Sequence, residues 1–177
     1  MFVSTPDRHL ASAYDRSERP LFVLSHRAFA TCGQELERLV ETVTQECAAL
    51  CAAEGAKAPV VRRSPDRCIV QLGPVALSLA WLRGSGSTVA EGELLAIVWR
   101  GAVAPRSSHS PERGRIARAA VAPTALWEEG FTVTAENEES WRWQTPAADV
   151  GAITTTALAE RCLGALRRAL AEGAPNE

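Results

Sequence analysis

The chain has 177 residues, of which 46% are hydrophobic and 23% are charged. These proportions are ordinary for a globular domain, and they exclude a disordered or collagen-like chain. The formal net charge of −2 gives no general attraction to nucleic acid or to acidic membranes, so such binding would need a local basic patch.

Residues 1–24 are polar, contain two prolines and show no regular apolar period. We expect them to form an arm, within which residues 21–24 make a short apolar patch that fits an edge strand or a staple on the next helix. The arm is too charged for a secretory signal, and the longest apolar run, around Pro74 to Leu82, is too short to cross a membrane. Arg greatly outnumbers Lys, as in GC-rich genomes. The sequence therefore predicts a cytoplasmic, bacterial protein.

The strongest periodic pattern lies between residues 29 and 51. Its apolar residues recur at steps of three and four, which places them on one face of a helix. They are Phe29, Cys32, Leu36, Leu39, Val40, Val43, Cys47, Leu50 and Cys51. Ser25 fits the cap of an early start, and Thr31 fits a capping box for a later one. Gly33 would cost the longer helix about 1 kcal/mol, and Gly55 predicts an end near Glu54.

From Pro59 onward the pattern changes to the alternation that is typical of strands. Strands are predicted over residues 60–61, 68–72, 75–82 and 93–103, and residues 84–88 form a turn that joins the last two in a hairpin.

The second half of the chain is predicted to hold a loop, three strands and a helix. Residues 105–114 have the composition of a loop, and residues 116–122 fit a strand. Residues 131–135 and 141–145 alternate and form a second hairpin. The last helix is expected to begin after one of the threonines at 154–156 and to end at Gly173.

This order of elements predicts the fold class α+β. We expect an antiparallel sheet of five to six strands, with an N-terminal and a C-terminal amphipathic helix packed on it. Residues 25–173 form a single domain in this interpretation, and residues 174–177 form a tail.

Five cysteines are present, which is an odd number, and they follow no regular framework. Cys47 and Cys51 lie four residues apart on one helical face, a spacing that fits a metal site only weakly. Free cysteine is among the most buried residue types, so core packing is the favoured interpretation. No catalytic residue, metal ligand or cofactor is predicted. This leans against an enzyme without excluding one, because active sites assemble from residues distant in sequence.

Four tryptophans are candidate ligand-binding or partner-binding residues: Trp81, Trp99, Trp141 and Trp143. On a strand, Trp141 and Trp143 share one face while Arg142 points the other way. If the two rings are exposed, they make a platform for a partner. If they face the helices, they belong to the core, which is the favoured interpretation.

A basic stretch is the remaining candidate, as an anion contact. It holds Arg100, Arg106, Arg113, Arg115 and Arg118. Such a stretch can meet phosphates or an acidic partner. Two solvated loops of opposite charge are favoured instead, because a cluster of glutamates follows and the net charge is not basic.

Three functions are consistent with these observations. The first is a non-enzymatic interaction domain that binds a protein partner or itself as a homodimer, because the first helix carries a long apolar seam. The second is a small-molecule-binding domain with a Trp-lined pocket between sheet and helix. The third, nucleic-acid binding through residues 100–118, is the least expected. No membrane partner is expected.

Overall fold

The computed structural model describes residues 21–84, 86, 88–103, 122–145 and 151–173. Most of the predicted polar arm, the tail at 174–177, the loop over 105–114 and residues 116–121 of the strand predicted over 116–122 lie outside these residues. Among the described residues, none of the helices is long and apolar enough to cross a membrane.

Helix α2 (His26–Ala53) begins at the earlier of its two predicted starts. The Ser25 hydroxyl accepts a hydrogen bond from the Ala28 amide at 3.4 Å, so Ser25 is the N-cap. The preceding residues form a 3-10 turn, η2 (Leu21–Leu24), and the edge strand that we considered there is wrong. Val23 of this turn is buried in the core. The helix ends before Gly55, whose φ of 63° suits glycine.

Six antiparallel strands form a meander in the order β1-β2-β3-β4-β5-β6. Their bounds are β1 (Val60–Ser64), β2 (Arg67–Leu72), β3 (Val75–Leu82), β4 (Glu93–Arg100), β5 (Thr124–Thr134) and β6 (Arg142–Gln144). A short 3-10 turn, η3 (Val89–Glu91), precedes β4. The predicted strands of both hairpins are therefore present, and the α+β fold class is confirmed.

Strand β5 corrects the prediction, since it begins at Thr124 rather than at Phe131. Glu128 and Glu129 lie between the strands predicted over 116–122 and 131–135, but both pair with β4. The Glu129 carboxylate binds the Arg161 guanidinium at 2.6 and 2.7 Å. The alternation of residues 124–130 is too weak to predict a strand. Pairing with β4 and the ion pair between Glu129 and Arg161 stabilise this part of β5 in the fold.

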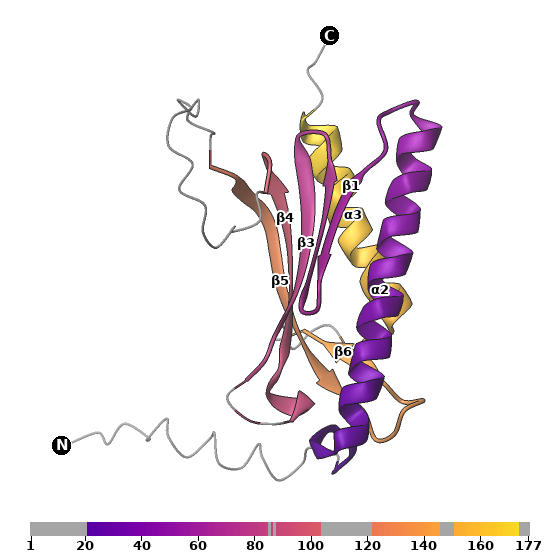
Figure 1. The fold of residues 1–177 in the computed structure, drawn as a ribbon, viewed down its shortest axis with the longest axis vertical. Helices are drawn as coiled ribbons and strands as arrows, with labels where there is room; N and C mark the ends of the chain where they lie inside the picture. Colours follow the sequence, from indigo (N-terminus) through magenta and orange to yellow (C-terminus); the bar gives the residue numbers. More distant parts are fainter. Residues whose placement is uncertain (1–20, 85, 87, 104–121, 146–150, 174–177) are drawn as a thin grey trace, which may run out of the picture.

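Helix α3 (Thr155–Gly173) closes the fold. Of the three candidate caps, Thr154 takes the role, because its hydroxyl accepts a hydrogen bond from the Ala157 amide at 3.2 Å. Both long helices cover the same face of the sheet (Figure 1). The core therefore lies between one helical layer and one sheet layer.

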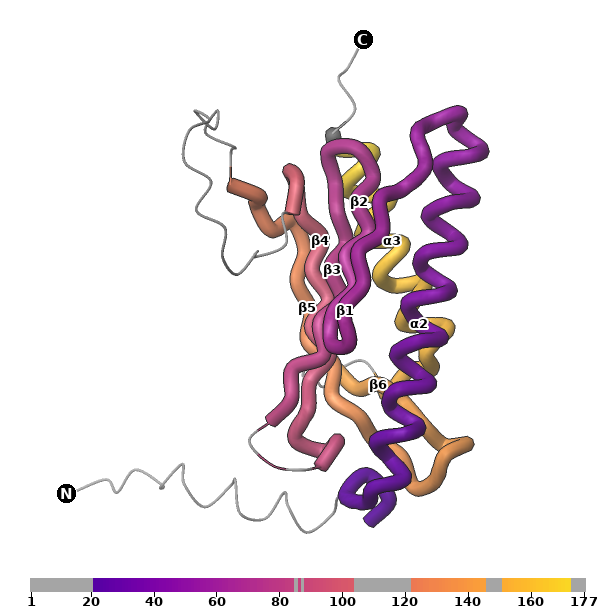
Figure 2. Tube along the Cα trace, viewed as in Figure 1, coloured from indigo at the N-terminus to yellow at the C-terminus, as the bar shows by residue number. Residues whose placement is uncertain are grey.

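The hairpin β1–β2 is shorter than its neighbours. Figure 2 shows that its turn ends partway along α2, whereas β3 and β4 continue beyond it. In the register, Arg67 at the start of β2 pairs with Ala80, and β3 runs on to Leu82. Beyond this point α2 faces the sheet without the two edge strands beside it. This difference in length positions the candidate site.

Candidate ligand-binding site

A cavity of about 290 Å³ lies where the short hairpin ends, between α2 and the sheet. Its lining comes from α2, from the β1–β2 hairpin and from β3 and β4. The lining residues are Gly33, Leu36, Glu37, Leu39, Val40, Arg63, Ser64, Pro65, Asp66, Arg67, Leu79, Trp81 and Leu94. The Trp81 amide donates to the Asp66 carbonyl at 2.8 Å, which fixes the hairpin turn against β3. The cavity is thus a product of strand length and not of a single loop.

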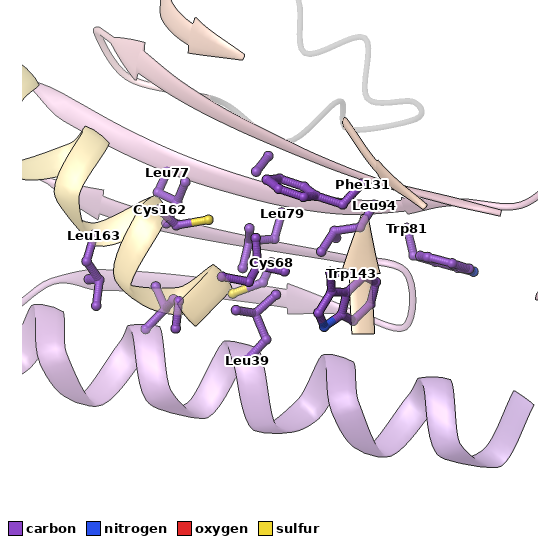
Figure 3. Close-up of a cluster of buried hydrophobic side chains, with 14 of the residues drawn as sticks. Leu39, Cys68, Leu77, Leu79, Trp81, Leu94, Phe131, Trp143, Cys162 and Leu163 are labelled. Carbon is purple, nitrogen blue, oxygen red and sulfur yellow. The ribbon is translucent and has the colours of Figure 1, made fainter. Parts of the chain in front are cut away.

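The inner wall of the cavity is apolar. Leu39 from α2 and Leu94 from β4 are essentially without solvent exposure, and Trp81 is 9% exposed. Figure 3 shows Trp81 at the end of the row of core side chains, in line with Leu94 and Trp143. The Trp81 and Trp143 rings meet edge to face, with their centroids 6.2 Å apart. A ligand in the cavity would therefore contact a rigid aromatic and aliphatic surface.

Gly92 allows the Trp81 ring to take this position. A Cβ atom at residue 92 would lie 2.2 Å from Cζ2 of Trp81, so the backbone approaches the indole more closely than any other residue would permit. The Trp81 ring therefore packs against both the backbone before β4 and the Trp143 ring.

The mouth of the cavity is polar and carries charges of both signs. Asp66 binds Arg83 at 3.0 Å, so its charge is already paired. Within the described part of the chain, Glu37, Arg63 and Arg67 form no ion pair. A mouth with unpaired charges beside an apolar wall is the arrangement that orients small ligands in proteins.

Gly33 lies at the same cavity, inside α2. A Cβ atom added there would meet nothing within 4 Å, so the position is open. Glycine costs a helix interior roughly 1 kcal/mol relative to alanine. Its presence keeps this stretch of the helix free of a side chain next to the cavity.

A buried polar network lies behind the aromatic wall. The Trp143 indole donates to the Thr155 hydroxyl at 2.9 Å, and this hydroxyl donates to the Glu35 carboxylate. Arg38 binds the same carboxylate at 2.7 Å. The network joins β6, α3 and α2, and it fixes the ring against which Trp81 packs.

The predicted tryptophans do not gather at one site. Trp81 lines the cavity, whereas Trp141 and Trp143 are buried in the core and do not line it. Trp99 is half-buried on the opposite face of the sheet, where its indole donates to Ser78 at 2.9 Å. The interpretation of Trp141 and Trp143 as core residues is confirmed, and of the four candidate tryptophans only Trp81 lines the cavity.

The basic stretch is described at one position only. Arg100 is exposed at the end of β4. Arg106, Arg113, Arg115 and Arg118 lie outside the described residues.

Sequence reasoning missed the residues that shape the mouth. Arg63, Asp66 and Arg67 lie between the strands predicted over 60–61 and 68–72, in a segment to which no role was assigned, and Gly33 was considered only as a cost to the helix. A glycine inside a predicted helix and a short polar turn between two strands are both visible in the sequence. Their contact across the cavity is not, because they lie about 30 residues apart in the chain.

All five cysteines are free and buried, which confirms the core-packing interpretation. Burial raises the pKa of the Cys32, Cys47 and Cys162 thiols to about 12, and it also raises the pKa of Cys68. These thiols are therefore protonated at neutral pH. Among the described residues, no group of three or more His, Cys, Asp or Glu side chains is arranged to hold a metal ion.

Comparison of the chain with protein-family models, with curated proteins and with solved structures gave no match. Its function therefore has to be inferred from the geometry of the site.

Proposed function

We propose that the protein binds a small, largely apolar molecule in the cavity between α2 and the sheet. One observation carries the proposal, namely an apolar wall of Leu39, Trp81 and Leu94 beside a mouth with unpaired charged side chains. The volume of about 290 Å³ is at the lower end of the range for ligand sites, roughly 300 to 1,000 Å³. The ligand is accordingly small, of the size of one aromatic ring with a short side chain.

The test uses 3-phenylpropan-1-ol as a neutral probe, titrated into ¹⁵N-labelled protein and followed by NMR. We expect saturable shifts of the Trp81 indole N–H, assigned with Trp81→Phe, and of backbone amides around the cavity. Gly33→Leu should weaken binding strongly by narrowing the cavity, whereas Gly33→Ala should retain it. Both are better helix formers than glycine, so loss of binding would not reflect loss of the helix.

Saturable shifts confined to other parts of the molecule would overturn the proposal. Equal affinity for the probe in Gly33→Leu and Gly33→Ala would do the same, since the cavity would then not be the site.

A second candidate function is association through the face of the sheet that the helices leave uncovered. This face carries Leu82, Leu95 and Trp99, of which Leu82 is 46% exposed and the other two are half-buried. The apolar seam of α2, in contrast, is occupied within the chain, because Leu39, Val43 and Cys47 have no exposed surface. Trp is enriched at the energetic centres of interfaces, which supports a role for Trp99.

Light scattering over a concentration series tests this second function. A dimer that persists at high salt, and that Leu82→Glu dissociates, would support it. Leu21→Glu is the matched control, because it replaces an exposed leucine that lies in the turn η2 and not in the sheet. A monomer at every concentration would refute it.

A further inference from the structure

The charges around the cavity mouth are unequal once the paired ones are set aside. Arg83 neutralises Asp66 at 3.0 Å. This leaves two guanidinium groups, Arg63 and Arg67, and one carboxylate, Glu37, among the charged lining residues. None of the three forms an ion pair within the described part of the chain. The mouth therefore has an excess of unpaired positive charge.

Arg63 is the cation that strand β1 directs toward the helices. In the register it lies opposite Cys68, which is buried in the core, so both side chains are on the helical face of the sheet. The Arg63 guanidinium donates to the Thr44 hydroxyl at 3.4 Å. This partner is neutral, and Arg63 has no ion pair among the described residues, so the charge of the guanidinium beside the cavity is uncompensated.

Arg62, the preceding residue, provides the internal comparison. Successive strand residues point to opposite faces, and the Arg62 guanidinium donates to the Val103 carbonyl at 3.2 Å on the other side of the sheet. The two arginines thus carry the same charge at neighbouring positions, and only Arg63 lines the cavity.

We infer that the ligand of the cavity is an amphipathic anion, with a compact apolar body against Trp81, Leu79 and Leu94 and one anionic group at Arg63. Guanidinium groups bind carboxylates and similar planar anions through paired N–H donors, and these charge-assisted hydrogen bonds are stronger than neutral ones. The apolar wall rejects a small inorganic anion, and the charged mouth favours an acid over a hydrocarbon. This inference rests on the proposed function.

The test compares three probes of the same shape: 3-phenylpropanoate, 3-phenylpropan-1-ol and 3-phenylpropylamine. Their affinities are measured by the same NMR titration at low salt. We expect the acid to bind roughly tenfold more tightly than the alcohol, which corresponds to one charge-assisted hydrogen bond, and the amine to bind least. Since Arg63 is an exposed residue, this preference should shrink at high salt.

Arg63→Gln should abolish the preference for the acid, so that the acid and the alcohol bind with similar affinity. Arg62→Gln removes the same charge from the opposite face and should preserve the preference. If the acid and the alcohol bind the cavity equally well, the anionic class is wrong and the proposed function stands. If neither binds, the proposed function fails as well.

Discussion

Buried thiols show how one residue type can look functional in sequence and be structural in the fold. Cys47 and Cys51 are four residues apart on α2, and both are buried. A reactive cysteine needs an accessible thiolate with a lowered pKa. Burial of the thiol instead raises the pKa of Cys47 to about 12, because it disfavours the charged thiolate. The cluster is therefore a part of the core.

The raised pKa of Cys162 predicts a loss of stability in alkaline solution. A thiol in the unfolded chain ionises near pH 8.5, whereas Cys162 keeps its proton up to about pH 12. Between these values the folded state binds more protons, so the free energy of unfolding falls by about 1.4 kcal/mol per pH unit for each such thiol. In urea unfolding from pH 8 to pH 10.5, Cys162→Ala should lose stability less steeply than the wild type by about this amount.

Ser25→Ala is the control for this experiment. It should lower stability by about 1 kcal/mol through loss of the helix cap and leave the pH slope as in the wild type. Identical slopes for Cys162→Ala and the wild type would show that the thiol does not ionise differently in the two states.

At the scale of elements, prediction succeeded where one strong local pattern was present. The apolar stripe of α2 continues for many turns, and its two predicted starts each had a capping residue, Ser25 and Thr31. The fold uses the earlier start, where Ser25 caps the helix and Val23, two residues before it, is buried in the core. Gly33 is then tolerated inside the helix at a modest cost.

Prediction failed where an element depends on its neighbour. The first part of β5 contains Glu128, Glu129 and Gly130, which do not favour a strand. The ladder with β4 and the ion pair from Glu129 to Arg161 stabilise it in the fold. The register also shifts between Val98 and Trp99, an irregularity that no residue in the sequence marks.

At the scale of the whole molecule, Thr155 connects three elements. Its hydroxyl accepts from the Trp143 indole and donates to the Glu35 carboxylate. Thr155 is also the first residue of α3, so Glu35 places a negative charge at the positive end of that helix. One buried hydroxyl therefore links the two helices to each other and to β6.

We expect Thr155→Val to lower the free energy of unfolding by about 2 kcal/mol or more, because the substitution keeps the shape but leaves a buried indole N–H and a carboxylate without this partner. The exposed neighbour Thr156 provides the control, and Thr156→Val should change stability by less than about 0.5 kcal/mol. Equal, small effects of the two substitutions in urea unfolding would show that the network does not stabilise the fold.

The sequence by itself determined the α+β class, both long helices, most strands and the burial of the cysteines, since these follow from local periodicity and from the general cost of exposing apolar groups. The tertiary structure alone decided which residues form the candidate site. Gly33, Arg63 and Trp81 belong to three elements that are remote in the chain, and they meet because the hairpin β1–β2 is shorter than the strands beside it. Strand pairing sets that difference in length, and the pattern of a single strand carries no information about where its neighbour ends.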